Sequence, residues 1–189
     1  MRPPILLDLP EMLETERLLV RCPLPGDGRA VNEAVRESLE DLRPWMPWAR
    51  SLPSVEESDE YVRRARARWL ERTDLALLLF LRESGQFVGG SGLHRIDWEV
   101  PRFEIGYWCR TSLQGRGLIT EAVRGITRFA FQELGAGRVE IRCDSRNLRS
   151  ARVAERCGYA LEAILRNHAR SADGSLRDTL LYARVAGGD

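Results

Sequence analysis

The sequence predicts an α/β (α+β) fold in which a mixed β-sheet of about seven strands is covered by about four helices. The first observation is the order of the segments, which runs strand, two helices, three strands, helix, strand, helix and two strands. The second is size and composition. The chain has 189 residues, 43% of them hydrophobic and 30% charged, which is enough to bury one full core. We therefore expect one domain over residues 1–189.

One strand and two helices are expected in the N-terminal third. Residues 17–22 have the pattern of a strand, which the following prolines end. Asp27 is predicted to cap a helix, because apolar residues recur at helical spacing from there until Pro44 stops the helix. Ser54 and Glu57 have the spacing of a capping box, which predicts the start of a second helix.

Three strands are expected in the middle of the chain. The first is a continuous apolar run, which is typical of a buried strand, and residues 84–86 turn it into the second. A further turn at 99–101 leads into the third strand, which ends at Trp108. The first two strands cover residues 76–81 and 87–96.

The C-terminal half is predicted to alternate helices and strands. A long helix ends at Gly135, and a short one is closed by Gly158. Asp173-Gly174 is a hairpin signal between the last two strands. The predicted segments are helix 117–134, strand 138–143, helix 150–156, and strands 159–166 and 176–185.

The most informative stretch lies between the strand ending at Trp108 and the long helix. It reads Gln-Gly-Arg-Gly-Leu-Ile-Thr-Glu-Ala from Gln114. A helix start offers free backbone N–H groups and the positive end of the helix dipole. Glycines at 115 and 117 let a ligand approach the backbone closely. The turn therefore predicts a site for a phosphate or pyrophosphate.

Composition excludes several classes of protein. A net charge of +1 argues against broad capture of nucleic acid or of a membrane surface. Four scattered Cys and two distant His give no metal-ligand or disulfide pattern. The chain has no Lys, so the Gly-Lys-Ser/Thr triplet of nucleotide-binding phosphate loops is absent. With neither a targeting segment nor a long apolar run, a cytoplasmic location is the default expectation.

Several motifs in order resemble the GNAT acetyltransferase superfamily, and its RimJ/RimL-like branch, over roughly residues 13–185. The turn after Trp108 resembles the family motif Gln/Arg-x-x-Gly-x-Gly/Ala, although Ile119 replaces its small last residue. The other motifs are Leu13-Glu14-Thr15-Glu16-Arg17-Leu18, Trp45-Met46-Pro47-Trp48, Glu104-Ile105-Gly106-Tyr107-Trp108, Thr120-Glu121-Ala122, Asn147-x-x-Ser150, Cys157-Gly158-Tyr159 and Arg177-Asp178.

This resemblance implies a mostly antiparallel sheet and an acetyl-CoA-dependent N-acetyltransferase. The acetyl group would pass directly to a primary amine in a ternary complex, without a metal. The branch implies a protein N-terminal α-amine, of the ribosomal-protein type. Two alternatives stay open: acetylation of a small amine such as an aminoglycoside, polyamine or amino acid derivative, and a non-catalytic CoA-binding sensor. A homodimer formed through the terminal hairpin or the Trp-rich loop is also open.

The resemblance assigns the cosubstrate to two neighbouring segments. The backbone of the strand end would pair with the pantetheine arm like an added strand, and an N–H there would stabilise the oxyanion. Backbone N–H groups of the turn would bind the pyrophosphate. The residues concerned are Trp108, Cys109 and Arg110 for pantetheine, and Gln114, Gly115, Arg116, Gly117, Leu118, Ile119 and Thr120 for the turn.

Glu104 is the candidate general base. Four residues before Trp108, it is expected to share a sheet face with Gly106 and Trp108, with open space beside Gly106. An α-amine titrates near about 7.7–8.0, so a carboxylate acting through water is an adequate base for it. The alternative is a Glu that holds an Arg or a backbone group in place.

Asn147 and Ser150 are expected where a strand feeds the short helix. Asn147 is interpreted both as the helix start and as a ligand of the pantetheine amide. Many relatives carry a Tyr general acid seven residues after this Asn, but here that position is Ala154. The group that protonates the leaving thiolate is therefore expected to be Ser150, or there is no dedicated acid. The alternative is that Ser150 is a plain helix cap.

The remaining candidates have ordinary structural explanations. Cys143 lies near the expected thioester, yet buried Cys is more often inert. His94 and His168 are interpreted as structural or acceptor-rim residues. Trp45 and Trp48 either line the acceptor pocket or pack in the core.

Overall fold

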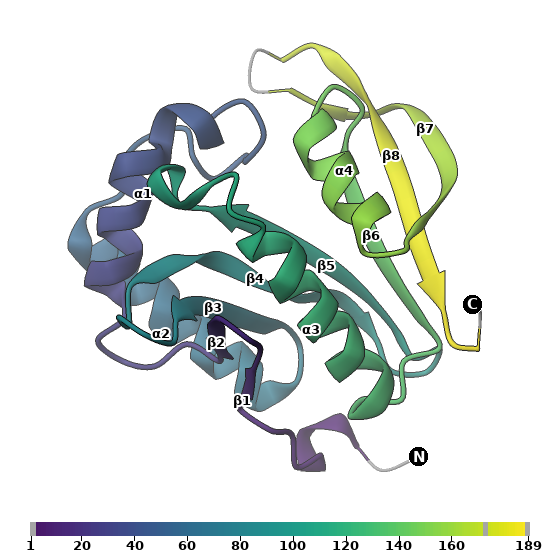
Figure 1. The fold of residues 1–189 in the computed structure, drawn as a ribbon, viewed down its shortest axis with the longest axis horizontal. Coiled ribbons are helices and arrows are strands. Elements are labelled where there is room, and N and C mark those ends of the chain that lie inside the picture. The colour runs from purple at the N-terminus through teal and green to yellow at the C-terminus, as the bar shows by residue number, and fades with distance from the viewer. Residues whose placement is uncertain (1–2, 172–173, 188–189) are drawn as a thin grey trace.

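A computed structural model describes residues 3–171 and 174–187, and within them one eight-stranded sheet in the order β1-β2-β3-β4-β5-β6-β8-β7 (Figure 1). Four α-helices and two short 3-10 helices accompany it: α1 (Gly28–Leu42), α2 (Val55–Glu71), α3 (Leu118–Gln132), α4 (Leu148–Arg156), η1 (Pro4–Leu6) and η2 (Thr111–Leu113). The strands are β1 (Met12–Glu14), β2 (Leu18–Arg21), β3 (Leu75–Leu81), β4 (Phe87–Asp97), β5 (Arg102–Cys109), β6 (Arg138–Asp144), β7 (Ala160–Arg170) and β8 (Leu176–Val185).

The predicted order of strands and α-helices is confirmed, with one additional strand. β1 is a three-residue strand that pairs with β2, and it was not expected because so short a run carries no periodicity. The hairpin of β7 and β8 is present, and Gly174 has a φ of +84°. Asp173, the other residue of the predicted turn, lies outside the described residues.

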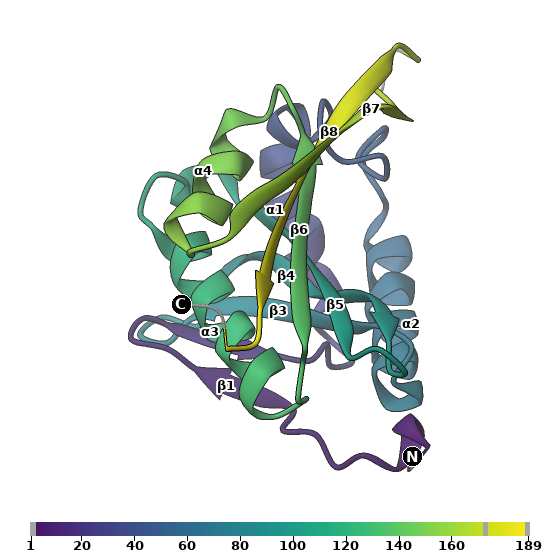
Figure 2. The same ribbon diagram turned by 90° about the vertical axis from the view of Figure 1, so that its right-hand side faces the viewer.

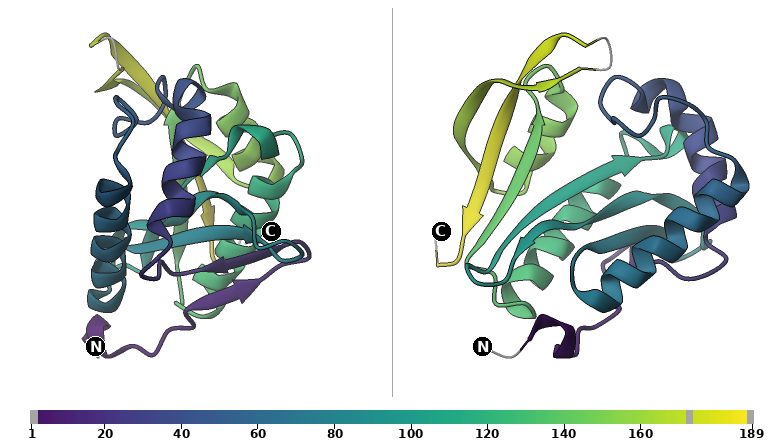
Figure 3. Two further views of the ribbon diagram at one scale, coloured as in Figure 1. Left: turned by 90° about the vertical axis from the view of Figure 1, so that its left-hand side faces the viewer. Right: turned by 180° about the vertical axis from the view of Figure 1, so that it is seen from behind.

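The strand pair β5–β6 sets the position of the site. It is the only parallel pair recorded in the described sheet, and its pairing runs from Arg102↔Arg138 to Glu104↔Glu140. Beyond Glu104 the two strands diverge, as the view from behind shows (Figure 3, right). The sheet is therefore split between the C-terminal halves of β5 and β6.

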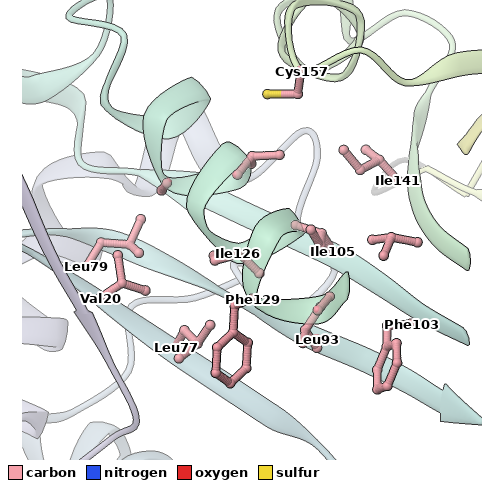
Figure 4. Close-up of a cluster of buried hydrophobic side chains, with 14 of the residues drawn as sticks. Val20, Leu77, Leu79, Leu93, Phe103, Ile105, Ile126, Phe129, Ile141 and Cys157 are labelled. Carbon is pink, nitrogen blue, oxygen red and sulfur yellow. The ribbon is translucent and has the colours of Figure 1, made fainter. Parts of the chain in front are cut away.

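Helices cover both faces of the sheet (Figure 2). α3 and α4 pack with the larger hydrophobic cluster, and α1 and α2 lie on the opposite face (Figure 3). In the larger cluster, Ile126 and Phe129 of α3 face Leu77, Leu93 and other strand residues (Figure 4). Burial of these side chains fixes α3 across the strands, because each fully buried Leu, Ile or Phe contributes roughly 1.5–3 kcal/mol.

The two predicted helix caps have different outcomes. The capping box at Ser54 is confirmed: its side chain accepts from Glu57 N–H, and the Glu57 side chain accepts from Ser54 N–H. The predicted cap at Asp27 is wrong as a side-chain cap, although α1 begins directly after it. Its carboxylate instead pairs with Arg21 at 2.7 Å and accepts from Leu24 N–H, so it is not available to the helix.

No helix in residues 3–171 or 174–187 is both long and apolar enough to cross a membrane. In the same residues, no group of three or more His, Cys, Asp or Glu side chains is placed to hold a metal ion. The four cysteines are free thiols.

Candidate active site

A cavity of about 670 Å³ opens at the split between β5 and β6. Its walls combine α1, the loop after it, α2, the face of β4 and β5, the end of β6, the start of α4 and the C-terminal hairpin. Four predicted site residues line it: Glu104, Trp108, Asn147 and Ser150. Both histidines, Cys143, Trp45 and Trp48 also line it, so the two tryptophans line a pocket, which was one of their two predicted roles.

Glycines form the floor of this cavity on β4 and β5. The strand register places Gly90 opposite Trp108 and Gly92 opposite Gly106, with His94 opposite Glu104. A Cβ at Gly90 would lie 2.5 Å from the Trp108 indole nitrogen, so the indole lies over that glycine. The missing side chain at Gly90 thus leaves room for the indole on the sheet surface.

Glu104 lies on the predicted face, beside Gly106 and Trp108. Its Oε2 is 3.4 Å from Arg95 Nε and 3.3 Å from Arg142 Nε. These are ion-pair distances, and the same oxygen is buried without a hydrogen-bond partner among the described residues. Glu104 therefore holds two arginines, as the alternative interpretation expected, while Oε2 keeps hydrogen-bonding capacity for a ligand or water.

The space beside Gly106 is not empty, which corrects one expectation. A Cβ on Gly106 would lie 3.3 Å from His94 Cδ2, so the imidazole occupies that position. His94 Nδ1 is 2.8 Å from Asp74 Oδ2, and Asp74 directly precedes β3. Asp74 was not singled out in the sequence, because only the strand register brings it beside His94.

The start of α4 brings Asn147, Ser150 and Tyr107 together. Asn147 is the helix cap, because its side-chain oxygen accepts from Ser150 N–H at 3.1 Å. The Ser150 hydroxyl donates to Tyr107 Oη at 3.0 Å, and Tyr107 Oη–H donates to the Ser150 carbonyl at 2.9 Å. Ser150 is thus not the cap, and its hydroxyl is held beside a phenol. Burial raises the pKa of Tyr107, which keeps this phenol protonated.

The turn before α3 has the geometry of an anion site. Gly115 and Gly117 have φ values of +75° and +76°, and Gly117 is the N-cap residue of α3. Among the described residues no side chain caps this helix start. The first backbone N–H groups of α3, at Leu118, Ile119 and Thr120, are therefore left for solvent or an anion. These residues, with Cys109 and Arg110, lie next to the cavity rather than in its lining.

Helix α1 fixes the segment between β5 and the turn. Glu37 accepts from Arg110 Nε at 2.5 Å and from Ser112 N–H at 2.8 Å, and Ser38 accepts from Thr111 N–H. Burial alone would raise the pKa of Glu37, but the hydrogen bonds from Ser112 and Arg110 outweigh it and lower the pKa. The carboxylate is thus ionised at neutral pH.

Two motifs that are far apart in sequence meet beside the turn. Glu121, in the first turn of α3, accepts from the Thr15 hydroxyl at 2.6 Å and from Arg17 N–H and Nε at 2.7 and 2.6 Å. Arg17 also donates to the Arg116 carbonyl at 2.9 Å. The residues between β1 and β2 therefore hold the Gly-rich turn in place.

The two cysteines near the site are poor nucleophiles at neutral pH. Burial raises the pKa of Cys109 to about 11. Burial also raises the pKa of Cys143, although a hydrogen bond with Ser150 opposes that shift. Since the thiolate is the reactive form, the interpretation of Cys143 as an inert residue is favoured.

The family described as acetyltransferase (GNAT) domain matches residues 17–160 of the chain. The chain belongs to the GNAT acetyltransferase family. It is 31% identical, over 80% of its length and 82% of the relative's, to YdaF of Bacillus subtilis (strain 168), a protein provisionally named as a ribosomal N-acetyltransferase. It is 28% identical to the ribosomal-protein-serine acetyltransferase of Escherichia coli (strain K12), over 76% of this chain and 80% of that one.

Solved structures of acetyltransferases share the fold. RimL, the ribosomal L7/L12 α-N-protein acetyltransferase in complex with coenzyme A, has a TM-score of 0.87 at 22% identity, covering 95% of this chain and all (100%) of that one. MccE, the microcin C7 self-immunity acetyltransferase in complex with acetyl-CoA and AMP, has a TM-score of 0.83 at 21% identity. The match covers 90% of this chain and 93% of the MccE chain. The GNAT chain is thus an acetyl-CoA-dependent N-acetyltransferase, as the resemblance implied.

Proposed function

We propose that this GNAT enzyme acetylates a protein N-terminal α-amine, of the ribosomal-protein type, by direct attack in a ternary complex. The relatives named for ribosomal-protein acetylation support this acceptor. The observation that carries the proposal is the split between β5 and β6. It connects the uncapped start of α3 with a cavity that contains a carboxylate and a helix cap. A ribosomal acceptor would place the reaction in a bacterial cytoplasm.

The cosubstrate acetyl-CoA is assigned to the split and the turn. Backbone N–H groups from Gly115 to Thr120 bind the pyrophosphate, and Arg116 adds positive charge. The free edge of β5 at Trp108, Cys109 and Arg110 pairs with the pantetheine arm. The Asn147 side chain uses its oxygen for the helix cap, which leaves its amide N–H groups for a pantetheine carbonyl.

The proton transfers are assigned to two groups. Glu104 accepts a proton from the attacking amine through a water, from its place on the cavity floor. Ser150 donates to the leaving thiolate and regains a proton from Glu104 through water, while its hydrogen bond to the buried Tyr107 hydroxyl holds the Ser150 hydroxyl in place. Ser150 thereby takes the role that a Tyr at position 154 has in many relatives, because Ala154 has no hydroxyl.

A small-molecule amine is the second candidate acceptor. A cavity of about 670 Å³ lies within the range of small-ligand sites, roughly 300–1,000 Å³. The structure of MccE was solved with AMP beside acetyl-CoA, so this fold also accommodates a small second ligand in that protein.

The deciding experiment incubates the purified protein with acetyl-CoA and a panel of acceptors, followed by mass spectrometry. The panel contains peptides with free Ser or Ala N-termini, the same peptides with blocked N-termini and an internal Lys, polyamines and aminoglycosides. We expect addition of one acetyl group confined to free N-termini. Acetylation of the small amines alone would overturn the proposed acceptor and keep the chemistry. Tight acetyl-CoA binding with no transfer would favour the CoA sensor.

A further inference from the structure

Three strands place a row of titratable side chains across the floor of the cavity. His94 of β4 is opposite Glu104 of β5 in the strand register, and Leu75 is opposite Leu93. Asp74, one residue before Leu75, therefore falls next to His94 on its other side, and the 2.8 Å contact between His94 Nδ1 and Asp74 Oδ2 confirms the pairing. The row reads Asp74, His94, Glu104.

The imidazole is held flat over glycine backbone. A Cβ at Gly92 would lie 2.8 Å from His94 Cε1, and a Cβ at Gly106 would lie 3.3 Å from Cδ2 and 3.5 Å from Nε2. The ring therefore fills the space that side chains at these two positions would take. Its Nε2 is on the side of β5, beside Gly106, and has no hydrogen-bond partner among the described residues.

The contact with Asp74 selects one form of the imidazole. A carboxylate that accepts from Nδ1–H leaves the lone pair on Nε2, which is the proton-accepting atom. The His94 and Asp74 side chains are 32% and 23% exposed, so a proton on the ring can leave to solvent. Other charged or titratable groups of the cavity lining include Tyr61 and Arg68 of α2, Arg95 of β4, Glu104 of β5 and Arg142 of β6.

Acetyl transfer to an ammonium needs two proton acceptors in sequence. The nitrogen of R–NH3⁺ must lose one proton before it attacks and a second when the C–S bond has broken. One of the two protons is released to solvent and the other ends on the CoA thiol. A single carboxylate would have to release the first proton before it could accept the second. Glu104 is already flanked by two guanidinium groups.

We propose that His94 is a second catalytic base, positioned by Asp74, that takes the first proton from the bound ammonium. Nε2 accepts this proton, which leaves R–NH2 and an imidazolium balanced by the Asp74 carboxylate. The amine attacks the thioester carbonyl, the C–S bond breaks and Ser150 protonates the thiolate, and the second proton of the amine passes through Glu104 and water to Ser150. His94 then releases its proton to solvent. The inference rests on the proposed acetylation of an amine, whichever amine it is.

Chemical rescue tests the role of His94. His94→Ala empties the space over Gly92 and Gly106, and we expect kcat to fall about 100-fold with KM for acetyl-CoA unchanged, since base catalysis contributes about 10²–10⁴-fold. Added imidazole should restore much of the lost kcat. His168→Ala removes the other imidazole of the cavity wall, and imidazole should restore nothing there. His94→Gln, which fills the space without a base, should be slow and insensitive to imidazole.

A double-mutant cycle tests the positioning role of Asp74. Asp74→Asn should lower kcat less than His94→Ala does, because the imidazole remains but is no longer oriented. In the His94→Ala background it should lower kcat no further, since residues that act through one another are non-additive. If the double variant lost the product of the two single-variant reductions in kcat, the pairing would be overturned and Asp74 would act on the acceptor directly.

Wild-type turnover separates failure of this inference from failure of the proposed function. The His94 and Asp74 variants are assayed with whichever amine of the panel the wild-type protein acetylates. The test therefore still applies if the acceptor is not a protein N-terminus. Wild-type kcat in folded His94→Ala and His94→Gln variants, checked by thermal unfolding, would overturn the role of His94. So would a slow, folded His94→Ala protein that imidazole does not accelerate.

Discussion

At the scale of single residues, the site depends on glycines, whose lack of a side chain leaves room for neighbouring rings. Gly92 and Gly106 leave room for the His94 ring, and Gly90 leaves room for the Trp108 indole. Glu104 lines the same cavity. A larger residue at any of these three glycines would crowd one of the two rings.

Glu104→Gln tests the assigned base at this scale. The amide keeps the shape of the side chain but cannot accept the proton, so we expect kcat to fall roughly 100-fold. CoA affinity should change little, because the turn at residues 114–120 is untouched. Steady-state kinetics and calorimetry with CoA measure the two effects. Unchanged kcat would remove Glu104 from the mechanism and leave it as the partner of two arginines.

Gly117→Ala tests the backbone of the turn. A non-glycine residue at a φ of +76° costs roughly 1–2 kcal/mol, and the strain falls where the pyrophosphate is expected. We expect a lower free energy of unfolding together with weaker CoA binding. Gly85→Ala is the matched control: Gly85 has a φ of +69° in the β3–β4 hairpin, so it should lose similar stability and keep CoA affinity. Equal CoA affinity in both variants would contradict the assignment.

At the scale of elements, the Gly-rich turn is held from two directions. α1 holds its entry through Glu37, and the β1–β2 connection holds its exit through Thr15 and Arg17. A loop fixed in this way needs less ordering when an anion binds. If the turn binds the cosubstrate as proposed, α1 and the β1–β2 connection would raise the affinity by holding the turn in place.

Glu121→Ala should weaken this support. It removes the acceptor for three hydrogen bonds, and because Arg17 is half-exposed we expect a loss of only about 1 kcal/mol in the free energy of unfolding. Urea denaturation measures it. Glu60→Ala breaks an exposed pair with Arg64 on α2 and should cost about 0.3–0.5 kcal/mol without affecting CoA binding. Glu121→Ala with unaltered stability and CoA affinity would show that the turn is rigid without this contact.

At the scale of the whole molecule, ion pairs between carboxylates and arginines occur in several elements. The pKa values of Glu37, Glu121, Glu140 and Asp144 are all lowered, because hydrogen bonds and arginines outweigh the effect of burial. Glu140, almost fully buried in β6, pairs with Arg138 and Arg142. These groups make folding stability depend on pH.

Stability should fall in acid. A carboxyl whose folded pKa is below its unfolded value stabilises the fold at pH values above the unfolded pKa, near 4.5 for Glu. That contribution is lost as the pH falls through the lower folded pKa. We expect the free energy of unfolding to be level between about pH 6 and 7 and to drop below about pH 4.5. Urea titrations at pH 7, 5, 4 and 3 measure it. A flat profile down to pH 3 would contradict the assignment of these lowered values.

Much of this protein could be predicted from its sequence because the signals are local. Periodicity gave the order of the strands and helices, and the Ser54–Glu57 spacing gave a capping box. Alternation in β5 put Glu104, Gly106 and Trp108 on one face. Each of these depends on residues within a few positions of one another, so backbone geometry alone is sufficient.

Only the tertiary structure decided which of these residues meet. The Asp74–His94 pair depends on the register between β3 and β4, and the Glu121 contacts join residues that are 106 and 104 positions apart. Asp27 satisfied a local capping pattern, yet Arg21 of the neighbouring strand took its carboxylate. The sequence by itself therefore determined the elements other than β1 and the Gly-rich turn before α3. Pairing across the sheet determined the cavity and the row of Asp74, His94 and Glu104, because contacts between distant residues exist only once the strands are in register.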